Sequence, residues 1–302
     1  MLRTTIGGID LESCIYNASG PRCTTAEELW ALAGSEAGAI LTKSATVLPR
    51  DGNAGKRYYE NEIMSINSTG LANMGYKFYG GLVGTFGEKP YIISLAGLTL
   101  EDNVKMVGEL PPEMAIELNL SCPNIVGKSQ VAYEYDVMET YLRKIYDEGE
   151  GKTIGVKLSP YFDQQQFIDA AELIGEYPVR YVTCINSIGY GLMVDIETEM
   201  PEIVPNRGHG GIGGKGILPI ALANVRQFRN LLPEKIDVIG CGGVETGADV
   251  FRHILVGAKA VQVGTQLMKE GVGVFKRLRG ELEEIMEGKG YKRVEEFCGK
   301  MV

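Results

Sequence analysis

Met114-Ala-Ile-Glu-Leu-Asn-Leu-Ser-Cys-Pro-Asn124 is a short, mostly apolar run that ends in a cluster of polar side chains. A run of this kind, ended by a proline, is typical of a buried β-strand. The residues that follow it combine a thiol, Cys122, with the amides of Asn119 and Asn124. A thiol can accept a proton, and amides suit the alternating N–H and C=O edge of a pyrimidine-like ring. Taken alone, the segment also fits a buried structural cysteine, because free cysteines usually behave as small hydrophobic residues.

Similar apolar or β-branched runs recur along the chain, and several are wholly apolar, which is typical of parallel strands buried on both faces. They span residues 14–18, 39–42, 91–95, 115–120, 153–158, 181–185, 237–240 and 260–263. Helical patterns lie between them at residues 25–33, 100–108, 133–148, 165–175, 220–231 and 248–256. Strands alternating with helices predict a (β/α)8 TIM barrel. No linker or charge block divides the 302 residues, so we expect a single barrel domain over residues 1–302.

Local signals support the predicted helices. Thr24-Thr-Ala-Glu-Glu28 and Thr99-Leu-Glu-Asp102 each place hydroxyl side chains before acidic residues. A hydroxyl cap and acidic residues in the first turn are the usual chemistry of a helix start. We therefore expect helices to begin at these two sites.

Two intervals, residues 44–81 and 189–218, are much longer than the 2–6 residues of an ordinary strand-to-helix connection. Both follow strands at the end of the barrel where active sites lie. We expect these insertions to cover the barrel mouth and bind ligand, and also to supply a dimer contact.

Composition excludes several classes of partner. The net charge is −9 and the isoelectric point is near 5.0, which argues against binding to nucleic acid or to an anionic membrane surface. The six cysteines form no C-x-x-C pair and no metal-like cluster with the two histidines, so we expect reduced thiols and no metal. The amino terminus has no apolar signal core, and no run of about 18 apolar residues occurs. We expect a cytoplasmic protein without a membrane segment.

Polar residues recur where the predicted strands end, and such ends converge on one mouth of a barrel. In chain order they are Ala18-Ser19-Gly20, Lys43-Ser44, Asn119, Cys122, Lys157, Asn186-Ser187, Cys241-Gly242-Gly243 and Gly264-Thr265. Lys157 ends an apolar strand, where its ammonium would be largely desolvated. Such a lysine either pairs with an anionic ligand or acts as a Schiff-base amine. Lys43 has the same placement, although a solvated lysine is an alternative there.

Glycines mark a candidate phosphate site. Gly242-Gly243 and Gly264-Thr265 follow the last two predicted strands, where many barrels bind phosphate through backbone N–H groups. Gly210-Gly-Ile-Gly-Gly214 lacks the G-x-G-x-x-G spacing of a dinucleotide fingerprint. We expect this second run to pack its backbone closely against a ligand or a helix.

Together these residues resemble a known family, the class 1A dihydroorotate dehydrogenases, which are FMN-dependent barrels of pyrimidine synthesis. The resemblance runs nearly end to end. It rests on Asn17-Ala-Ser-Gly-Pro21, Leu41-Thr-Lys-Ser44, Pro49-Arg-Asp-Gly-Asn53, Ser65-Ile-Asn-Ser68, Gly70-Leu71, Asn119-Leu-Ser-Cys-Pro-Asn124, Gly127-Lys128, Val156-Lys-Leu158, Asn186-Ser187, Gly210-Gly-Ile-Gly-Gly214, Ala221-Leu-Ala-Asn-Val225 and Cys241-Gly-Gly243. Thr69 and Ala72 depart from the Met and Pro that the family commonly has in its carboxylate-binding loop.

The resemblance implies roles for individual residues. Cys122 would be the catalytic base that takes the C5 proton of dihydroorotate while C6 delivers a hydride to N5 of FMN. Lys157 would lie near N1 and O2 of the flavin and stabilise the reduced ring. The implied substrate contacts are Lys43, Asn67, Ser68, Thr69, Gly70, Leu71, Asn119, Asn124, Asn186 and Ser187. The implied FMN contacts are Ala18, Ser19, Gly20, Lys43, Ser44, Asn119, Lys157, Ile185, Gly214, Gly242, Gly243, Gly264 and Thr265.

The resemblance also implies a cytoplasmic homodimer that reoxidises its flavin with fumarate. Three alternatives stay open at this point. One is a class 1B-like enzyme whose partner subunit passes electrons to NAD, and another is an aldolase-type barrel that forms a Schiff base on Lys157. The third is a flavin-binding protein without turnover of dihydroorotate, suggested by Thr69 and Ala72.

Overall fold

A computed structural model of the chain describes residues 1–121 and 130–301. Its centre is an eight-stranded parallel sheet with the order β3-β16-β15-β10-β9-β8-β7-β4. The strands are β3 (Ile15–Asn17), β4 (Ile40–Leu41), β7 (Tyr91–Leu95), β8 (Ala115–Asn119), β9 (Thr153–Leu158), β10 (Tyr181–Cys184), β15 (Asp237–Cys241) and β16 (Ala260–Val263). Each of the eight predicted strands is confirmed to within one or two residues, because runs of mostly apolar or β-branched residues mark strands buried on both faces.

The sheet curls into a barrel whose last seam, between β3 and β4, is closed by a side chain. Asn17 donates from Nδ2 to the carbonyl of Leu41 at 2.6 Å, and its Oδ1 accepts from the Leu41 N–H at 2.9 Å. The amide of this buried asparagine thus makes the pair of bonds that a neighbouring strand would make. The predicted TIM barrel is confirmed.

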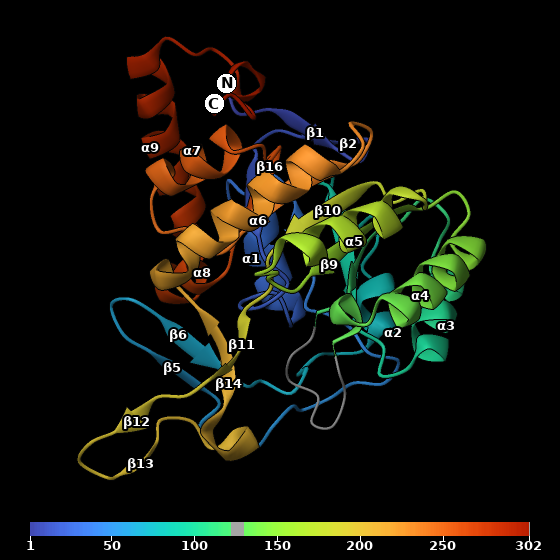
Figure 1. Cartoon of the computed structure of the whole chain (residues 1–302), viewed down its shortest axis with the longest axis vertical. Helices are drawn as coiled ribbons and strands as arrows, with labels where there is room; N and C mark the ends of the chain where they lie inside the picture. The colour runs from blue at the N-terminus through green and yellow to red at the C-terminus, as the bar shows by residue number, and fades with distance from the viewer. Residues whose placement is uncertain (122–129, 302) are drawn as a thin grey trace.

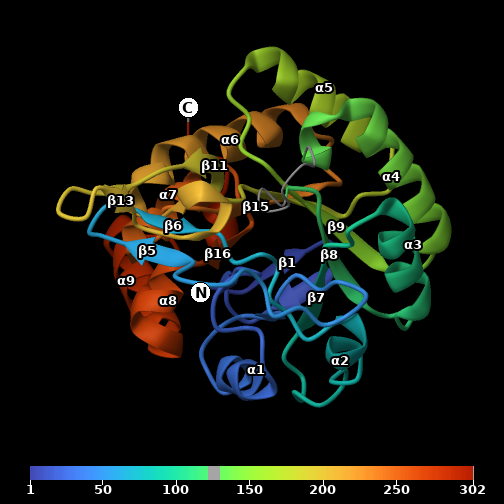
Figure 2. The same cartoon turned by 90° about the horizontal axis from the view of Figure 1, so that it is seen from below.

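Helices surround the barrel (Figure 2). They are α1 (Ala26–Ala33), α2 (Tyr76–Gly80), α3 (Leu100–Glu109), α4 (Tyr135–Glu148), α5 (Gln164–Gly175), α6 (Leu218–Leu231), α7 (Gly247–Leu255), α8 (Thr265–Glu270) and α9 (Val274–Lys289). The expected helix starts are confirmed, because Thr25 and Thr99 form capping boxes with Glu28 and Asp102.

The helices that follow the last strand were not predicted from the sequence. The longest of these, α9, buries Val274, Leu278, Leu282 and Met286, which recur every four residues. This spacing is the ordinary signature of a helix with one buried face, so the pattern was present in the sequence. Both α8 and the short α2 give weaker signals because they are only six and five residues long.

The two long insertions meet in a second sheet. The first contributes β5 (Tyr58–Glu60) and β6 (Ser65–Asn67), and the second contributes β11 (Ile188–Gly191) and β14 (Gly210–Gly213). These form a four-stranded sheet in the order β11-β14-β6-β5, with Ile212 opposite Ile66. Figure 1 shows this sheet below the barrel, with the hairpin of β12 (Val194–Asp195) and β13 (Met200–Pro201) projecting beyond it.

The opposite end of the barrel is closed by a hairpin of β1 (Thr4–Ile6) and β2 (Ile9–Leu11). The Gly7 N–H at its turn donates to Oδ2 of Asp237, the first residue of β15, at 2.8 Å. This hairpin covers the ends at which the strands begin, so a ligand site is left to the end at which the strands finish (Figure 1).

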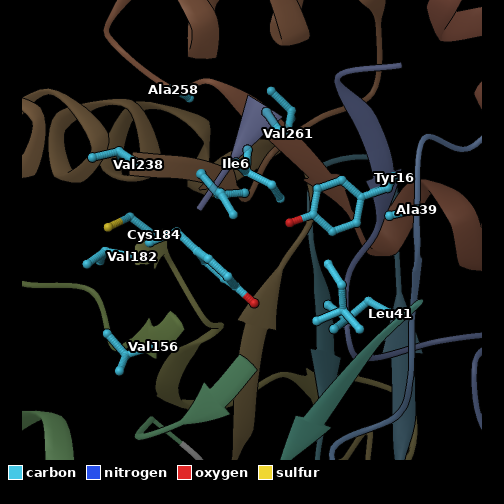
Figure 3. Packing of buried hydrophobic residues seen from close by; sticks show 14 of the residues in the cluster. Ile6, Tyr16, Ala39, Leu41, Val156, Val182, Cys184, Val238, Ala258 and Val261 are labelled. Carbon is cyan, nitrogen blue, oxygen red and sulfur yellow. The ribbon is translucent and has the colours of Figure 1, made fainter. Parts of the chain in front are cut away.

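Buried side chains from many strands form the hydrophobic core, and Figure 3 shows Tyr16, Leu41, Val156, Val182 and Cys184 among them. Within the described residues no helix is both long and apolar enough to cross a bilayer. The five cysteines that the structure describes are free, and no cluster of potential metal ligands occurs in the same part of the chain.

Candidate active site

A cavity of about 480 Å³ lies where the barrel strands end. Most of the residues that the sequence analysis proposed as contacts line it together. They are Ala18, Ser19, Gly20, Lys43, Ser44, Asn67, Thr69, Leu71, Asn119, Lys157, Ile185, Asn186, Ser187, Gly214, Gly242, Gly243, Gly264 and Thr265. Ala18 and Thr265, which are 247 positions apart, thus meet in one place, because parallel strands bring their carboxyl ends to the same rim.

Among the proposed residues that the structure describes, Ser68 and Gly70 are not part of this lining. Cys122 and Asn124 lie outside the described residues. Ser68 is buried, and both its carbonyl and its hydroxyl accept from Nδ2 of Asn53, at 2.9 and 3.3 Å. The Gly70 carbonyl accepts from Nε of Arg50 at 3.3 Å. Ser68 and Gly70 therefore support the loop that presents Thr69 and Leu71 to the cavity.

Ser44, Asn119, Ser121 and Asn186 form a hydrogen-bonded group, here called the amide cluster. Asn119 donates from Nδ2 to Ser44 Oγ at 3.2 Å, and its Oδ1 accepts from Ser121 Oγ at 3.0 Å. Asn186 donates from Nδ2 to Ser121 Oγ at 2.9 Å. These bonds fix the orientation of both amides, so donors and acceptors at the cavity wall are held in place before any ligand binds.

Asn67 reaches the cavity from the second sheet. It ends β6, and its Nδ2 donates to the carbonyl of Gly211 in β14 at 3.1 Å. The two insertions therefore position this residue jointly. The run at residues 210–214 was expected to pack against a ligand or a helix. Gly210 and Gly211 pack against Asn67 and Ser187, whereas Gly213 and Gly214 line the cavity.

Lys157 extends from β9 into a set of side chains inside the barrel, here called the buried polar network (Tyr16, Glu117, Lys157, Thr183 and Gln262). Its Nζ donates to Oε1 of Gln262 at 3.0 Å and lies 3.7 Å from Sγ of Cys241. Gln262 donates in turn from Nε2 to Oε2 of Glu117 at 2.6 Å and to the Tyr16 hydroxyl at 3.2 Å. Gln262 thus stands between a buried ammonium and a buried carboxylate.

The network determines the charge on Lys157. Burial disfavours the ammonium form and by itself would lower the pKa of Lys157. Cys241 and the Glu117 carboxylate raise this pKa by more than burial lowers it, so it lies above its ordinary value. Burial also raises the pKa of the Cys241 thiol, and the Lys157 ammonium opposes that effect. Lys157 is therefore a cation at the cavity wall, and within the described residues it has no carboxylate at ion-pair distance.

Glu117 and Gln262 were not predicted as site residues, although their signal was present in the sequence. Each is a polar residue inside an otherwise apolar strand, in Ala115-Ile-Glu-Leu118 and Ala260-Val-Gln-Val263. Both are almost wholly buried, and Oε1 of Glu117 has no hydrogen-bond partner in the described chain. Buried polar side chains are costly unless they are paired or functional, so such positions mark candidate sites.

The remaining side of the cavity is built from backbone, and we call Gly242, Gly243 and Gly264 the glycine wall. Gly242 and Gly243 have φ of +125° and +78°, values that residues with side chains rarely adopt. A Cβ on Gly243 would lie 2.6 Å from the backbone nitrogen of Leu218 at the start of α6. The loop can therefore take this path only with glycine, and its bare backbone faces the cavity.

Comparisons with known proteins give consistent descriptions over nearly the whole chain. Residues 1–286 match the family model described as dihydroorotate dehydrogenase. The chain is 48% identical to the dihydroorotate dehydrogenase (fumarate) of Trypanosoma cruzi, over 94% of this chain and 93% of that protein. It is 44% identical to dihydroorotate dehydrogenase A (fumarate) of Lactococcus lactis, over 100% and 99% of the two chains. It is 45% identical to the dihydroorotate dehydrogenase (fumarate) of Saccharomyces cerevisiae, over 96% and 95%.

The fold has a counterpart among solved structures. The crystal structure of an Eimeria tenella DHODH in complex with ferulenol superposes with a TM-score of 0.82, covering 99% of this chain and 88% of that one. Its sequence identity is 18%, so this likeness concerns the fold. The family model and the curated relatives extend over nearly the whole length, and on that ground the chain belongs to the dihydroorotate dehydrogenase family.

Proposed function

We propose that this chain oxidises (S)-dihydroorotate to orotate, with FMN as the hydride acceptor and fumarate as the final oxidant. The observation that carries the proposal is the joint lining of one cavity by Ser44, Asn119 and Asn186 of the amide cluster, by the Lys157 ammonium and by the glycine wall. Oriented amides suit a pyrimidine ring, the ammonium suits developing negative charge, and bare backbone suits a phosphate.

The residues present fit FMN. A volume of about 480 Å³ lies within the usual range of small-molecule sites. A Cβ on Gly264 would point into open space, with Ala18 Cβ as its nearest neighbour at 3.8 Å, so a side chain there would occupy the cavity. Lys157 supplies a buried positive charge that the described protein does not neutralise directly. When bound, FMN supplies the acceptor for the hydride that leaves C6 of the substrate.

The chain's own residues supply the remaining chemistry. Cys122, as a thiolate, takes the proton from C5, and the loss of this proton and of the C6 hydride leaves the C5=C6 double bond of orotate. Cys122 lies outside the described residues, so its role rests on the sequence motif. Asn119 and Asn186 orient the ring, and Lys157 keeps its positive charge where negative charge develops. Fumarate then takes up one hydride and one proton to become succinate.

The Schiff-base alternative is disfavoured by the charge on Lys157. A lysine that attacks a carbonyl must be neutral, and such lysines have a lowered pKa. The pKa of Lys157 is instead raised. The curated relatives carry the description "fumarate", which supports the fumarate-using enzyme over one that passes electrons to NAD.

The test is spectroscopic and kinetic. The purified protein should be yellow, with one non-covalent FMN per chain, and dihydroorotate should bleach the colour without oxygen. Fumarate, a quinone and NAD are then compared side by side as oxidants, and fumarate should restore the colour fastest. A colourless protein that cannot be reconstituted with FMN, or a strict need for NAD, would contradict the proposal.

We further propose that residues 1–302 act as one FMN-binding domain and form a cytoplasmic homodimer. The hairpin beyond the second sheet carries exposed apolar residues, and Ile196 on it is 85% exposed, with Tyr190, Met200 and Val204 exposed nearby. Clustered exposed apolar side chains are typical of protein interfaces. Light scattering should give a dimer at micromolar concentration, and Ile196→Asp should shift it towards monomer, whereas Lys289→Asp on α9 should not.

A further inference from the structure

His253 is a fully buried residue of α7 that contacts the glycine wall from behind. Its Nε2 lies 3.0 Å from the carbonyl oxygen of Gly242. A carbonyl oxygen accepts hydrogen bonds and cannot donate them, so Nε2 must carry the proton in this pair. Burial lowers the pKa of His253 to about 4, so the imidazole is neutral at ordinary pH. Nδ1 has no partner in the described chain, as expected of the unprotonated nitrogen of this tautomer.

The strand in front of His253 leaves room for the imidazole. Gly240 lies in β15, and a Cβ at this position would be 2.8 Å from Cγ of His253 and closer still to Nδ1. Any other residue at 240 would therefore displace the ring. Gly240 and His253 form a matched pair, since the glycine gives the imidazole its path to the Gly242 carbonyl.

The direction of the Gly242 carbonyl fixes that of the next N–H. The peptide between Gly242 and Gly243 is trans, so its C=O and N–H point in opposite directions. With the carbonyl held on the His253 side, the Gly243 N–H points away from α7. No hydrogen-bond acceptor for this N–H is found among the described residues, and Gly243 lines the cavity.

We propose that His253 is a positioning residue, which holds the Gly242–Gly243 peptide with its N–H towards the cavity and so presets a donor for the phosphate of FMN. The inference rests on the proposed function, because it assumes that FMN binds with its phosphate at the glycine wall. A flexible glycine pair would otherwise sample several peptide orientations, and binding would have to select one of them.

Two amide substitutions separate the hydrogen bond from the mere presence of a polar side chain. In His253→Gln the amide nitrogen falls near the place of Nε2 and can still donate to the Gly242 carbonyl. In His253→Asn the amide falls near the place of Nδ1 and is too short to reach it. His253→Phe keeps a ring of similar size without any donor, and thermal unfolding of all three variants shows whether each is folded.

The experiment measures the binding of FMN and of riboflavin, which lacks the phosphate, to each apoprotein by flavin fluorescence. We expect His253→Asn and His253→Phe to bind FMN about 10-fold or more weakly than wild type, with riboflavin binding unchanged. His253→Gln should retain most of the affinity for FMN. This selective loss is an outcome that a general structural role of His253 would not produce.

Two results would overturn the inference, and they differ from a failure of the proposed function. Unchanged affinity for FMN in folded His253→Asn and His253→Phe, or an equal loss for FMN and riboflavin, would show that His253 does not position the phosphate donor. A wild-type apoprotein that binds both flavins equally, or neither, would instead overturn the phosphate site itself and with it the inference.

Discussion

The glycine wall and the buried polar network border the same cavity but are built in different ways. In the glycine wall, Gly242 and Gly243 adopt backbone conformations that residues with side chains rarely adopt, and Leu218 and His253 lie behind them. The buried polar network consists of long side chains from barrel strands, joined by hydrogen bonds and carrying one buried cation. The first should therefore govern binding through shape, and the second should govern the reaction through charge.

The largest effect is expected at Cys122, which belongs to neither region. Cys122→Ala removes the proposed base, and general-base loss typically slows a reaction by roughly 10²–10⁴-fold. FMN should stay bound, because the thiol is not among its proposed contacts. An ordinary thiol has a pKa of about 8.5, so wild-type turnover should rise with pH as the thiolate forms.

Anaerobic flavin reduction by dihydroorotate, followed from about pH 6 to about pH 10, measures both effects. Cys298→Ala serves as the control, since Cys298 donates to the Ala258 carbonyl away from the cavity. If Cys122→Ala reduces its flavin at the wild-type rate, the base lies elsewhere.

The next effect tests whether the buried polar network governs the reaction through charge. Lys157→Ala removes the cation, and the loss of one such electrostatic contact typically costs about 3 kcal/mol, or on the order of 10²-fold in rate. FMN should also bind more weakly. Lys215→Ala, at a largely exposed lysine near the same mouth, should change neither quantity by much.

Stopped-flow reduction and flavin titration of both lysine variants give the comparison. If Lys157→Ala and Lys215→Ala change the reduction rate and the FMN affinity equally, the burial of the Lys157 cation does not contribute to either quantity. Trapping an imine on Lys157 with borohydride would point instead to Schiff-base chemistry.

A smaller effect tests whether the glycine wall governs binding through shape. Gly243→Ala forces a side chain onto a residue with φ of +78° and against the backbone of Leu218. Strain of this kind costs of order 1–3 kcal/mol, so we expect FMN affinity to fall by roughly 10-fold, with a smaller effect on the reduction rate of the loaded enzyme.

The matched control is Gly280→Ala in α9, where an added Cβ meets no atom within 4 Å. It should leave FMN affinity unchanged and raise stability by about 0.5–1 kcal/mol, because alanine is the better helix former. Thermal unfolding and flavin titration of both variants check this. If Gly243→Ala slows flavin reduction without weakening FMN binding, the glycine wall does not govern binding alone, and the proposed division between the two regions is wrong.

The smallest effect concerns Glu117, which does not reach the cavity. Its carboxylate helps to raise the pKa of Lys157 against the effect of burial, so Glu117→Gln should lower that pKa. In wild type the ammonium stabilises the fold fully below its ordinary pKa of 10.5, and this contribution is lost as the pH rises through the higher folded-state pKa. In Glu117→Gln the stabilising contribution of the Lys157 ammonium should begin to be lost at lower pH.

Nuclear magnetic resonance of labelled lysine side chains reads the Lys157 titration directly. Thr183→Val is the control, because it removes a 2.8 Å hydrogen bond to Glu117 but no charge. If Thr183→Val and Glu117→Gln shift the titration equally, hydrogen bonding rather than charge links Glu117 to Lys157.

Much of the site could be predicted because the end of a strand can be recognised from the residues next to it in the sequence. Lys157, Asn119 and Gly242 each lie at the end of a mostly apolar run, and in a barrel that placement alone brings them to one mouth. His253 and Gln262, which were not predicted from the sequence, act through other residues of the site. His253 reads as an ordinary helix position, and Gln262 contacts Lys157 across 105 positions of sequence, which no local pattern reports.

The sequence by itself determined the strands, most of the helices and the polar residues at the strand ends, because burial on one or both faces leaves a periodic pattern within each element. Tertiary structure alone decided that Asn17 closes the barrel seam and that two insertions share one sheet. It also decided that Gln262 separates Glu117 from Lys157 and that His253 supports Gly242. A pattern records that a residue is buried, whereas its partner depends on how distant segments meet when the chain closes on itself.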